Sequence, residues 1–397
     1  MTQPPSPAAP LAGITVVEFG HSVAAPYAGQ ILADLGARVI KVEGPAGDDA
    51  RQWGPPFWHG SSAAFQSLNR NKQSVVADIK APADLERLKA LMTGADVVIQ
   101  NMRPGLVARF GLDAGALRAV NPRLVVCNLG AFGATGPLAD RPGYDPLMQA
   151  FAGIMAVTGE PGRPPVRVGP SIVDQGAGMW SVIGILAALF ARAETGAGCT
   201  VDTSLFETAL AWMTVPIANA LASGREPGKS GSETPMLAPY RAFRAADGDV
   251  VIAAGNNNLF ARLCEVLGHP EWASDPRFVD NAGRVGNRVD LNAMIEEVVG
   301  QRPVAHWVAA LEKVGVPVSP VHGVGEVLAH PQTEAVGMLV PTPGGEMRLV
   351  ATPVSFDGER PAVRSAAPAL GSSPLASAAD AAPGSAPGSA PGSAATG

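Results

Sequence analysis

The sequence is poor in cysteine and in charge, and both shortages exclude classes of protein. Its three cysteines, Cys127, Cys199 and Cys264, lie far apart and are odd in number, so they form neither a disulfide framework nor a metal-binding spacing. We therefore expect a reducing, cytoplasmic setting. Charged residues make up only 16% of the 397, and 29 Lys and Arg against 35 Asp and Glu leave a net charge of −6. This balance argues against nucleic acid or an anionic membrane as the main partner.

The sequence also lacks long apolar runs and targeting signals. The longest run, Trp180 to Ala191, is too short to span a bilayer. The extension 1–10 is rich in proline and alanine and has neither a basic nor an apolar region, so we expect no secretory signal. Apolar residues nevertheless make up 47% of the chain, which predicts a globular protein with a full core.

The usual cofactor motifs are absent as well. No Gly-x-Gly-x-x-Gly follows the first expected strand, and no Walker A sequence occurs, so neither a dinucleotide nor a nucleotide fingerprint is present. No two of the six histidines have the spacing of metal ligands on one helix. We expect no metal and no tightly bound cofactor.

What the sequence does contain is an alternation of strands and helices. Leu11 to Val42 predicts a strand, a helix with Pro26 in its first turn, and a parallel second strand. Further strands are expected at 74–79, 97–100, 124–128 and 201–205, an amphipathic helix at 82–92, and a helix at 175–192 that is apolar all round and therefore buried. This pattern is typical of a doubly wound, Rossmann-like α/β domain.

A smaller α+β domain follows. Tyr240 to Ala254 predicts a hairpin turning at Asp247-Gly248, and helices are expected at 259–267 and within 291–314. We assign 11–226 to the large domain, 227–319 to the small domain and 320–371 to a return into the large domain. The tail 372–397 contains three Pro-Gly-Ser-Ala repeats and is expected to be disordered.

The first candidate site is the turn Gly20-His21-Ser22-Val23-Ala24. It nearly fits the nucleophile elbow of serine hydrolases, with Ser22 as the nucleophile. The fifth position is Ala24 rather than glycine, and no earlier strand supplies an oxyanion donor. A tight turn that meets a ligand at the carboxyl edge of the sheet is the alternative.

Basic and amide side chains lie beside the expected strands. Asn69-Arg70-Asn71-Lys72 precedes one strand, and Asn101-Met102-Arg103 follows another, with Arg109 shortly after. Side chains at the carboxyl ends of parallel strands face the ligand crevice, so Lys72 and Arg109 are candidates for phosphate binding and Asn101 is a candidate for binding a ligand amide or hydroxyl. Ordinary surface charge is the alternative for each.

Asp174 is the most informative carboxylate. It stands after an extended apolar segment and before a long helix, whose N-terminus should keep it ionised. Gly176 and Gly178 would leave space for a ligand. A plain N-cap is the alternative reading.

An ordered set of motifs resembles the family III CoA-transferases, the CaiB/BaiF type, over about 11–371. The motifs are Leu11-Ala-Gly-Ile-Thr-Val-Val-Glu-Phe19, Leu32-Ala-Asp-Leu-Gly-Ala-Arg-Val-Ile-Lys-Val-Glu43, Asn69-Arg-Asn-Lys-Gln-Ser74, Asp96-Val-Val-Ile-Gln-Asn-Met-Arg-Pro-Gly105, Asn121-Pro-Arg-Leu-Val125, Gly143-Tyr-Asp-Pro146, Ile172-Val-Asp174, Pro239-Tyr-Arg-Ala-Phe243 and Asp247-Gly248. The resemblance implies a homodimer of two interlocked rings.

The resemblance also implies roles for single residues. Asp174 looks like the nucleophile, and Tyr144 and Asp145 lie where the family places residues around the acyl group. The loop Gly228 to Gly231 is similar to a glycine-rich flap that covers the site. The residues implied in binding the CoA ester are Val23, Ala24, Asn69, Arg70, Asn71, Lys72, Asn101, Met102, Arg103, Arg109, Tyr144 and Asp145.

A second branch of the same family epimerises 2-methylacyl-CoA esters with a catalytic histidine in a Gly-His-Asp sequence. This chain has Gly143-Tyr144-Asp145, and a phenol, with an ordinary pKa of about 10, is a poor base at neutral pH. A protein that binds CoA without catalysis is the non-enzyme alternative; the presence of Asp174 counts against it.

The sequence therefore predicts an enzyme that moves CoA from an acyl-CoA, with succinyl-CoA expected, to the carboxylate of an acceptor acid. The resemblance implies an aspartyl-acyl anhydride and then an aspartyl-CoA thioester, without metal, ATP or nicotinamide. We expect a dicarboxylate pair, with Arg51, Arg70 and Arg167 as candidate clamps. The partners are small molecules and a second copy of the chain, not nucleic acid or a membrane.

Overall fold

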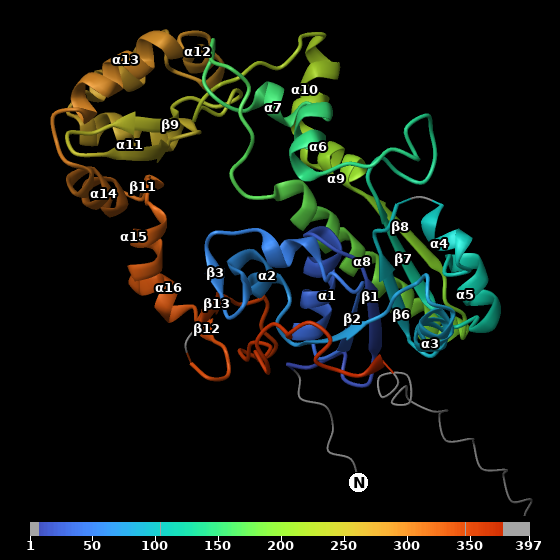
Figure 1. The fold of residues 1–397 in the computed structure, drawn as a ribbon. Coiled ribbons are helices and arrows are strands. Elements are labelled where there is room, and N and C mark those ends of the chain that lie inside the picture. Colours follow the sequence, from blue (N-terminus) through green and yellow to red (C-terminus); the bar gives the residue numbers. More distant parts are fainter. Residues whose placement is uncertain (1–7, 104, 346, 376–397) are drawn as a thin grey trace, which may run out of the picture. The chain divides into compact units, whose positions relative to one another are not determined.

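The computed structural model describes residues 8–103, 105–345 and 347–375, which form two compact units (Figure 1). Unit 1 contains the residues up to Ala152, Val168–Val215 and those from Val336 onward; unit 2 contains Gly153–Arg167 and Pro216–Ala335. The expected small domain, 227–319, lies inside unit 2. The segment Gly153–Arg167, which the sequence had placed in the large domain, belongs to unit 2, where its Gly159 carbonyl accepts a hydrogen bond from the Gly231 N–H.

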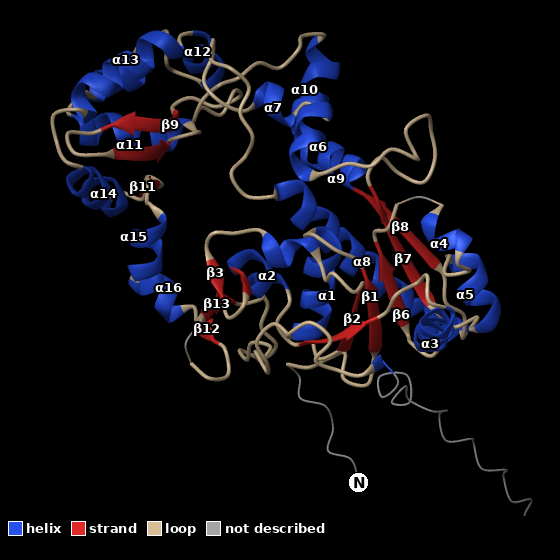
Figure 2. Ribbon diagram, viewed as in Figure 1, coloured by secondary structure: helices blue, strands red, loops and turns tan. Residues whose placement is uncertain are grey.

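A six-stranded parallel sheet forms the centre of unit 1, in the order β5-β2-β1-β6-β7-β8 (Figure 2). Its strands are β1 (Thr15–Phe19), β2 (Arg38–Glu43), β5 (Lys72–Val76), β6 (Val97–Gln100), β7 (Val125–Gly130) and β8 (Thr200–Ser204). The order reverses between β1 and β6, which makes the crevice beyond their carboxyl ends the topological switch point. The expected α/β class and parallel sheet are confirmed.

Helices cover both faces of this sheet. On one face α1 (Ala24–Asp34) and α8 (Ile172–Thr195) pack through Leu32 and Ile185; on the other, α3 (Pro82–Thr93) and α5 (Ala114–Val120) pack through Leu88 and Leu117. The remaining elements of unit 1 are α2 (Ala63–Leu68), α4 (Leu106–Arg109), α6 (Asp145–Phe151), α9 (Leu205–Trp212), the 3-10 helix η1 (Asp49–Gln52) and the short strands β3 (Phe57–Trp58), β4 (Ser61–Ser62), β12 (Leu339–Pro341) and β13 (Arg348–Val350).

Two expectations for α8 are wrong. The helix begins at Ile172, so that residue and Val173 are helical rather than extended. It is also not buried on every face, because Met179, Trp180, Ile183 and Phe190 are exposed. By length and composition alone α8 is long and apolar enough to cross a bilayer, as is the bent pair of α9 with α10 (Thr214–Ser223), although one face of α8 packs on the sheet.

Unit 2 is built on an antiparallel sheet of order β11-β10-β9, with β9 (Tyr240–Arg244), β10 (Asp249–Ala253) and β11 (Val318–Pro320). The expected hairpin is confirmed. Its core includes Phe243, Ile252, Leu263, Ile295 and Leu311. Its helices are α7 (Ile154–Val157), α10 from Pro216 onward, α11 (Asn257–Leu267), η2 (Pro270–Ser274), α12 (Asn281–Gly286), α13 (Arg288–Val299), α14 (Val304–Lys313), α15 (Val324–Ala329) and α16 (Pro331–Ala335).

An ion cluster of Glu18, Lys41, Asp48 and Lys72 lies buried beneath the carboxyl end of β1. Lys41 Nζ lies 2.9 Å from Glu18 Oε1 and 2.8 Å from Asp48 Oδ2, and Lys72 Nζ lies 2.7 Å from Glu18 Oε2. Removing one member of such a group leaves a buried charge without its partner, which costs about 3–5 kcal/mol. The cluster therefore fixes β1, β2 and β5 to one another.

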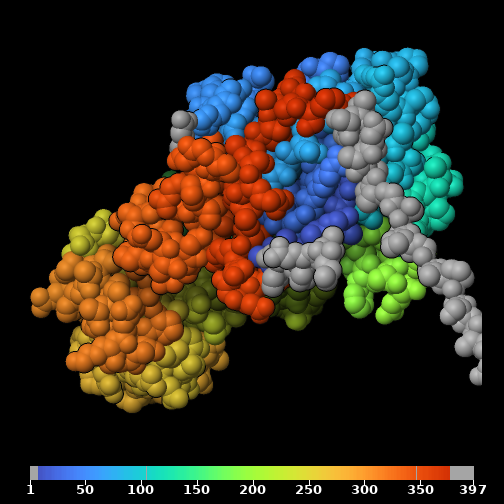
Figure 3. Space-filling model, turned by 90° about the horizontal axis from the view of Figure 1, so that it is seen from below, coloured from blue at the N-terminus to red at the C-terminus, as the bar shows by residue number. Residues whose placement is uncertain are grey.

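Asn71 and Arg70 bind the C-terminal segment of unit 1 through hydrogen bonds. Asn71 Oδ1 accepts hydrogen bonds from the backbone N–H groups of Arg364 and Ser365, at 2.6 and 3.0 Å. Arg70 forms a buried ion pair of 2.7 Å with Asp34 and donates to the Val350 carbonyl. Figure 3 shows this C-terminal segment, in red, against the blue N-terminal residues of unit 1.

We predict that Arg70→Met lowers the free energy of unfolding by about 3–5 kcal/mol, because it leaves Asp34 buried without a cation. Chemical denaturation followed by circular dichroism measures the change. The matched control is Arg109→Met, at an exposed arginine whose guanidinium makes no hydrogen bond or ion pair with a described residue; it should change stability by less than about 0.5 kcal/mol. Equal effects in the two variants would contradict the structural role of Arg70.

Candidate active site

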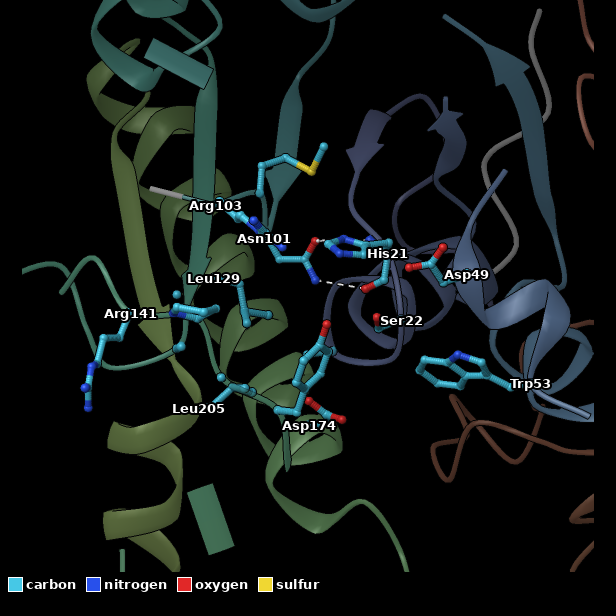
Figure 4. A pocket seen from close by; sticks show the side chains of 17 residues that line it. His21, Ser22, Asp49, Trp53, Asn101, Arg103, Leu129, Arg141, Asp174 and Leu205 are labelled. Carbon is cyan, nitrogen blue, oxygen red and sulfur yellow. Dashed lines mark hydrogen bonds between the residues drawn. The ribbon is translucent and has the colours of Figure 1, made fainter. Parts of the chain in front are cut away.

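A pocket of about 270 Å³ lies at the switch point (Figure 4). It is lined by the turn after β1, the two ends of η1, the loop after β6, the end of β7, the loop before α6 and the first residues of α8 and α9. The sequence-predicted residues among its lining are Ala24, Asn101, Met102, Arg103, Tyr144 and Asp174. The volume is small, so the pocket suits the reacting end of a CoA thioester rather than the whole molecule.

Asp174 lies in the first turn of α8, with Ser171 as the N-cap residue. Its carboxylate makes no hydrogen bond or ion pair with any described residue, so the N-cap reading is excluded. Burial, and then the charge of Asp145, raise the pKa of Asp174 to about 7. The expectation that the helix N-terminus keeps this carboxyl fully ionised is therefore wrong, because loss of water outweighs the helix dipole.

Asp145 supplies the cap that α8 lacks. Its Oδ2 accepts hydrogen bonds from the backbone N–H of Val173 at 2.8 Å and of Asp174 at 3.3 Å, while its Oδ1 accepts from Gln149 Nε2 at 2.6 Å. The side chain is buried and does not line the pocket. The resemblance placed Asp145 around the acyl group; in this structure it positions the helix that carries Asp174, and the exposed Tyr144 lines the pocket instead.

The turn after β1 is held from both sides. Asn101 Oδ1 accepts from the His21 N–H at 3.0 Å, and Asn101 Nδ2 donates to the His21 carbonyl at 2.9 Å, a contact drawn in Figure 4. Asp48 Oδ1 accepts from the Ser22 N–H at 3.1 Å, and Lys41 Nζ donates to the Gly20 carbonyl at 2.9 Å. These bonds hold Ser22 at a left-handed φ of 69°.

The turn leads directly into α1, whose N-terminus has no side-chain cap. The backbone N–H groups of Ala24 and Ala25 find no acceptor among the described residues, and Ala24 lines the pocket together with Asp174. Free N–H groups at a helix N-terminus stabilise negative charge that develops on an oxygen. Val23 is buried at the cap position beside them.

The structure does not bring the Asn69–Lys72 motif to the pocket. Lys72 Nζ is completely buried and bonded to Glu18, to the Pro26 carbonyl and to Asn69 Oδ1. Asn69, Arg70 and Asn71 are buried and used in contacts within unit 1. The four residues do not line this pocket, and their expected CoA contacts stay a prediction. Arg109, also expected to contact CoA, is exposed and lies outside the pocket lining.

The space at Gly176 and Gly178 is filled by protein rather than ligand. A Cβ on Gly176 would lie 2.8 Å from Trp212 Nε1, and one on Gly178 would lie 2.8 Å from the Ala24 carbonyl. The two glycines therefore let α9 and α1 approach α8 closely. The expected ligand space at these positions is wrong.

The expected carboxylate clamps lie elsewhere. Arg51 is paired with Glu43 at 2.7 Å and donates to the Pro368 carbonyl, and Arg70 is paired with Asp34. Arg167 belongs to unit 2. The pocket instead contains Arg103 and Arg141, of which the sequence analysis missed Arg141. His21 and Trp53 were also missed as lining residues; the position of His21 in the switch-point turn was the only available signal.

The loop Gly228 to Gly231, expected to act as a flap, packs within unit 2. Lys229 Nζ donates to the Arg163 carbonyl at 2.5 Å, and the Gly231 N–H donates to the Gly159 carbonyl at 3.0 Å. The loop is thus tied to the segment Gly153–Arg167. Its closing over the site stays a prediction.

A carboxylate without a partner among the described residues and an uncapped helix N-terminus share this pocket, and comparison with known proteins gives the family of the chain. The model of CoA-transferase family III matches residues 11–373, so the chain belongs to this family.

Named relatives and a solved structure agree. The chain is 41% identical to the acetyl-CoA:oxalate CoA-transferase of Acetobacter aceti, covering 93% of this chain and 95% of the relative, and 39% identical to the succinate–glutarate CoA-transferase of Agrobacterium fabrum, covering 86% and 87%. It superposes on the crystal structure of a CaiB/BaiF family protein from Brucella suis with a TM-score of 0.82 at 42% identity, covering 91% of this chain and 97% of that one.

The protein is therefore a CoA-transferase, and the predicted class of enzyme is confirmed. The three alternatives, a serine hydrolase, a racemase and a CoA-binding protein without catalysis, are therefore rejected. Ser22 does line the pocket, but no described residue forms a hydrogen bond with its hydroxyl to act as a base.

We predict that kcat/KM rises with pH through an apparent pKa near 7, the dependence expected of a reaction that uses the ionised carboxylate of Asp174. Asp145→Asn removes the neighbouring charge and should move this midpoint to lower pH. Asp49→Asn is the matched control, because Asp49 lines the same pocket but does not contribute to the shift. A midpoint that moves equally in both variants, measured by pH–rate profiles, would contradict the assignment.

Proposed function

We propose that this enzyme transfers CoA from an acyl-CoA to the carboxylate of an acceptor acid through covalent intermediates on Asp174. The observation that carries the proposal is the carboxylate of Asp174, which lines the pocket, has no partner among the described residues and shares the pocket with the N-terminus of α1. The names of the relatives support the reaction type.

The first half of the cycle uses the donor. Asp174 attacks the thioester carbonyl carbon, the C–S bond breaks, and an aspartyl-acyl anhydride and CoA thiolate result. The thiolate then attacks the Asp174 carbonyl carbon of the anhydride, which releases the donor acid as its carboxylate and leaves an aspartyl-CoA thioester. No net proton is transferred.

The second half reverses these steps with the acceptor. Its carboxylate attacks the aspartyl-CoA thioester to form a new anhydride and thiolate. The thiolate attacks the acceptor's carbonyl carbon, which forms the product thioester and regenerates Asp174. The anhydrides hydrolyse easily, so water must be kept out, and the apolar lining of Leu129, Trp53 and Leu205 serves this purpose.

The backbone donors of α1 supply the electrostatic part of catalysis. Each attack places negative charge on a carbonyl oxygen, and the N–H groups of Ala24 and Ala25 are in place before the charge develops. One such donor is worth about 3–4 kcal/mol in the transition state. Burial, which raises the pKa of Asp174, also removes water from its carboxylate before the reaction begins. A poorly solvated carboxylate is the stronger nucleophile.

For the substrates we propose a dicarboxylate acceptor, with succinyl-CoA as the donor. Relatives named for oxalate and for glutarate support the acceptor class, and one named for succinate supports the donor. Asn101, Met102 and Arg103 lie at the pocket where the loop after β6 begins, and we assign them and the nearby exposed Arg109 to binding of the CoA moiety. No metal or tightly bound cofactor takes part.

For the assembly we propose a cytoplasmic homodimer of interlocked rings, with no nucleic-acid or membrane partner. The support is the exposed apolar stripe of α8, formed by Met179, Trp180, Ile183 and Phe190. Four large apolar side chains on one helix are costly to leave in water, and a second copy of the chain would cover them.

We predict that Asp174→Ala and Asp174→Asn retain CoA binding but lose exchange by several orders of magnitude, since no carboxylate remains to form the anhydride. Mass spectrometry of wild-type protein mixed with acyl-CoA should find an acyl or CoA adduct on the peptide that contains Asp174.

Glu194→Gln, an exposed carboxylate near the other end of α8, is the control and should keep full activity. Asp174→Asn should be no less stable than wild type at pH 8: a carboxyl whose native pKa is raised to about 7 costs stability as the pH rises from its ordinary pKa of about 4 to about 7, and this cost is fully present at pH 8. Near-normal transfer by Asp174→Ala, or an adduct elsewhere, would refute the mechanism.

We also predict that sedimentation velocity finds a dimer down to the lowest measurable concentration, because a threaded chain has no stable monomer. Ile183→Asp, in the middle of the α8 stripe, should yield poorly folded or dissociated protein. The control Val120→Asp changes an exposed valine on α5, on the opposite face of the sheet, and should leave the dimer intact. A stable, folded wild-type monomer would contradict the proposed interlocked dimer.

A further inference from the structure

Arg141 is a cation without a partner at the edge of the catalytic pocket. It is exposed, and its guanidinium makes no hydrogen bond or ion pair with any described residue. Arg51 and Arg70, by contrast, are committed to Glu43 and Asp34. A guanidinium binds carboxylates through two parallel hydrogen bonds, so a free one beside the nucleophile is available for an anionic substrate.

A second, apolar pocket of about 540 Å³ adjoins the first, and Arg141 and Pro142 line both. Phe132, Leu147 and Phe151 form its surface, with the rings of Phe132 and Phe151 5.2 Å apart in an edge-to-face contact. Of these two pockets, Arg103 lines the catalytic one and not the apolar one. Arg141 is thus the cation that joins the reacting centre to an apolar surface suited to the carbon chain of an acid.

The backbone that carries Arg141 is fixed relative to Asp174. Two residues further on, a Cβ on Gly143 would lie 2.7 Å from Met148 and 3.0 Å from Ala131, so the loop is closely packed there. The loop then reaches Asp145, whose carboxylate holds the first turn of α8. The distance between the Arg141 backbone and the nucleophile is therefore set by the fold, while the long arginine side chain can adjust to a ligand.

Arg141 does not act on Asp174 itself. Burial and Asp145 raise the pKa of Asp174, and no cation lowers it. In Figure 4 the Arg141 side chain is directed away from Asp174. Its charge is therefore available to a group that lies several bonds away from the reacting carboxylate.

We propose that Arg141 binds the remote carboxylate of the acceptor acid, with the acid's carbon chain against Phe132, Leu147 and Phe151. This inference rests on the proposed function and goes beyond it by naming the residue that selects the acid. It assigns the enzyme a preference for dicarboxylates with a carbon spacer, such as glutarate, over oxalate and over monocarboxylates of equal length.

The test measures kcat/KM for glutarate, succinate, oxalate and valerate, with acetyl-CoA as the donor so that the donor brings no remote carboxylate. Arg141→Met should lower the ratio of glutarate to valerate by about ten- to a hundredfold, the worth of a charge-assisted hydrogen bond, and leave the KM for acetyl-CoA unchanged. Arg141→Lys should retain part of the preference. Arg103→Met, the matched cation on the other loop, should instead raise the KM for acetyl-CoA equally with every acid.

Each other outcome overturns the inference. If Arg141→Met raises the KM for acetyl-CoA with all acids alike, Arg141 binds a phosphate of CoA. If the wild-type enzyme transfers CoA but the ratio is the same in Arg141→Met, the remote carboxylate is bound elsewhere. If the wild-type protein transfers CoA to no acid from acetyl-CoA or succinyl-CoA, the proposed function fails together with the inference.

Discussion

The site depends on one buried interaction, the ion cluster of Glu18, Lys41, Asp48 and Lys72. Lys41 donates to the Gly20 carbonyl and holds Asp48, which in turn accepts from the Ser22 N–H, so the cluster sets the course of the chain between β1 and α1. Burial lowers the pKa of Lys72 to about 8, a sign of how much this arrangement costs. The fold tolerates that cost because every charge has an opposite charge within 3 Å.

Two helix N-termini are brought together by different means. The ion cluster and Asn101 hold the turn that leads into α1, whose uncapped N-terminus lies at the pocket. Asp145 caps α8, so the carboxylate of Asp174 is not needed as a cap. The glycines Gly176 and Gly178 then allow α8 to pack closely against its neighbours. The carboxylate of Asp174 and the uncapped N-terminus of α1 thus lie at one pocket although about 150 residues separate them in the chain.

Much of this followed from the sequence. The parallel α/β class, the hairpin of unit 2 and the place of Asp174 at the start of a long helix depend on local signals. These signals are β-branched runs, helix-boundary residues and turn residues, each of which influences only the few residues next to it in the sequence. The ordered motifs likewise point to the CoA-transferase family, and the family model confirms it.

Only the tertiary structure decided what the polar motifs do. Lys72, Asn71 and Arg70 resemble ligand-binding residues in the sequence, yet they serve partners such as Glu18 and residues near 364, which no local pattern can reveal. The protonation of Asp174 was misjudged for the same reason, because burial and a carboxylate 29 positions away determine it. Local chemistry fixes which elements form; long-range packing decides which charges remain free for a substrate.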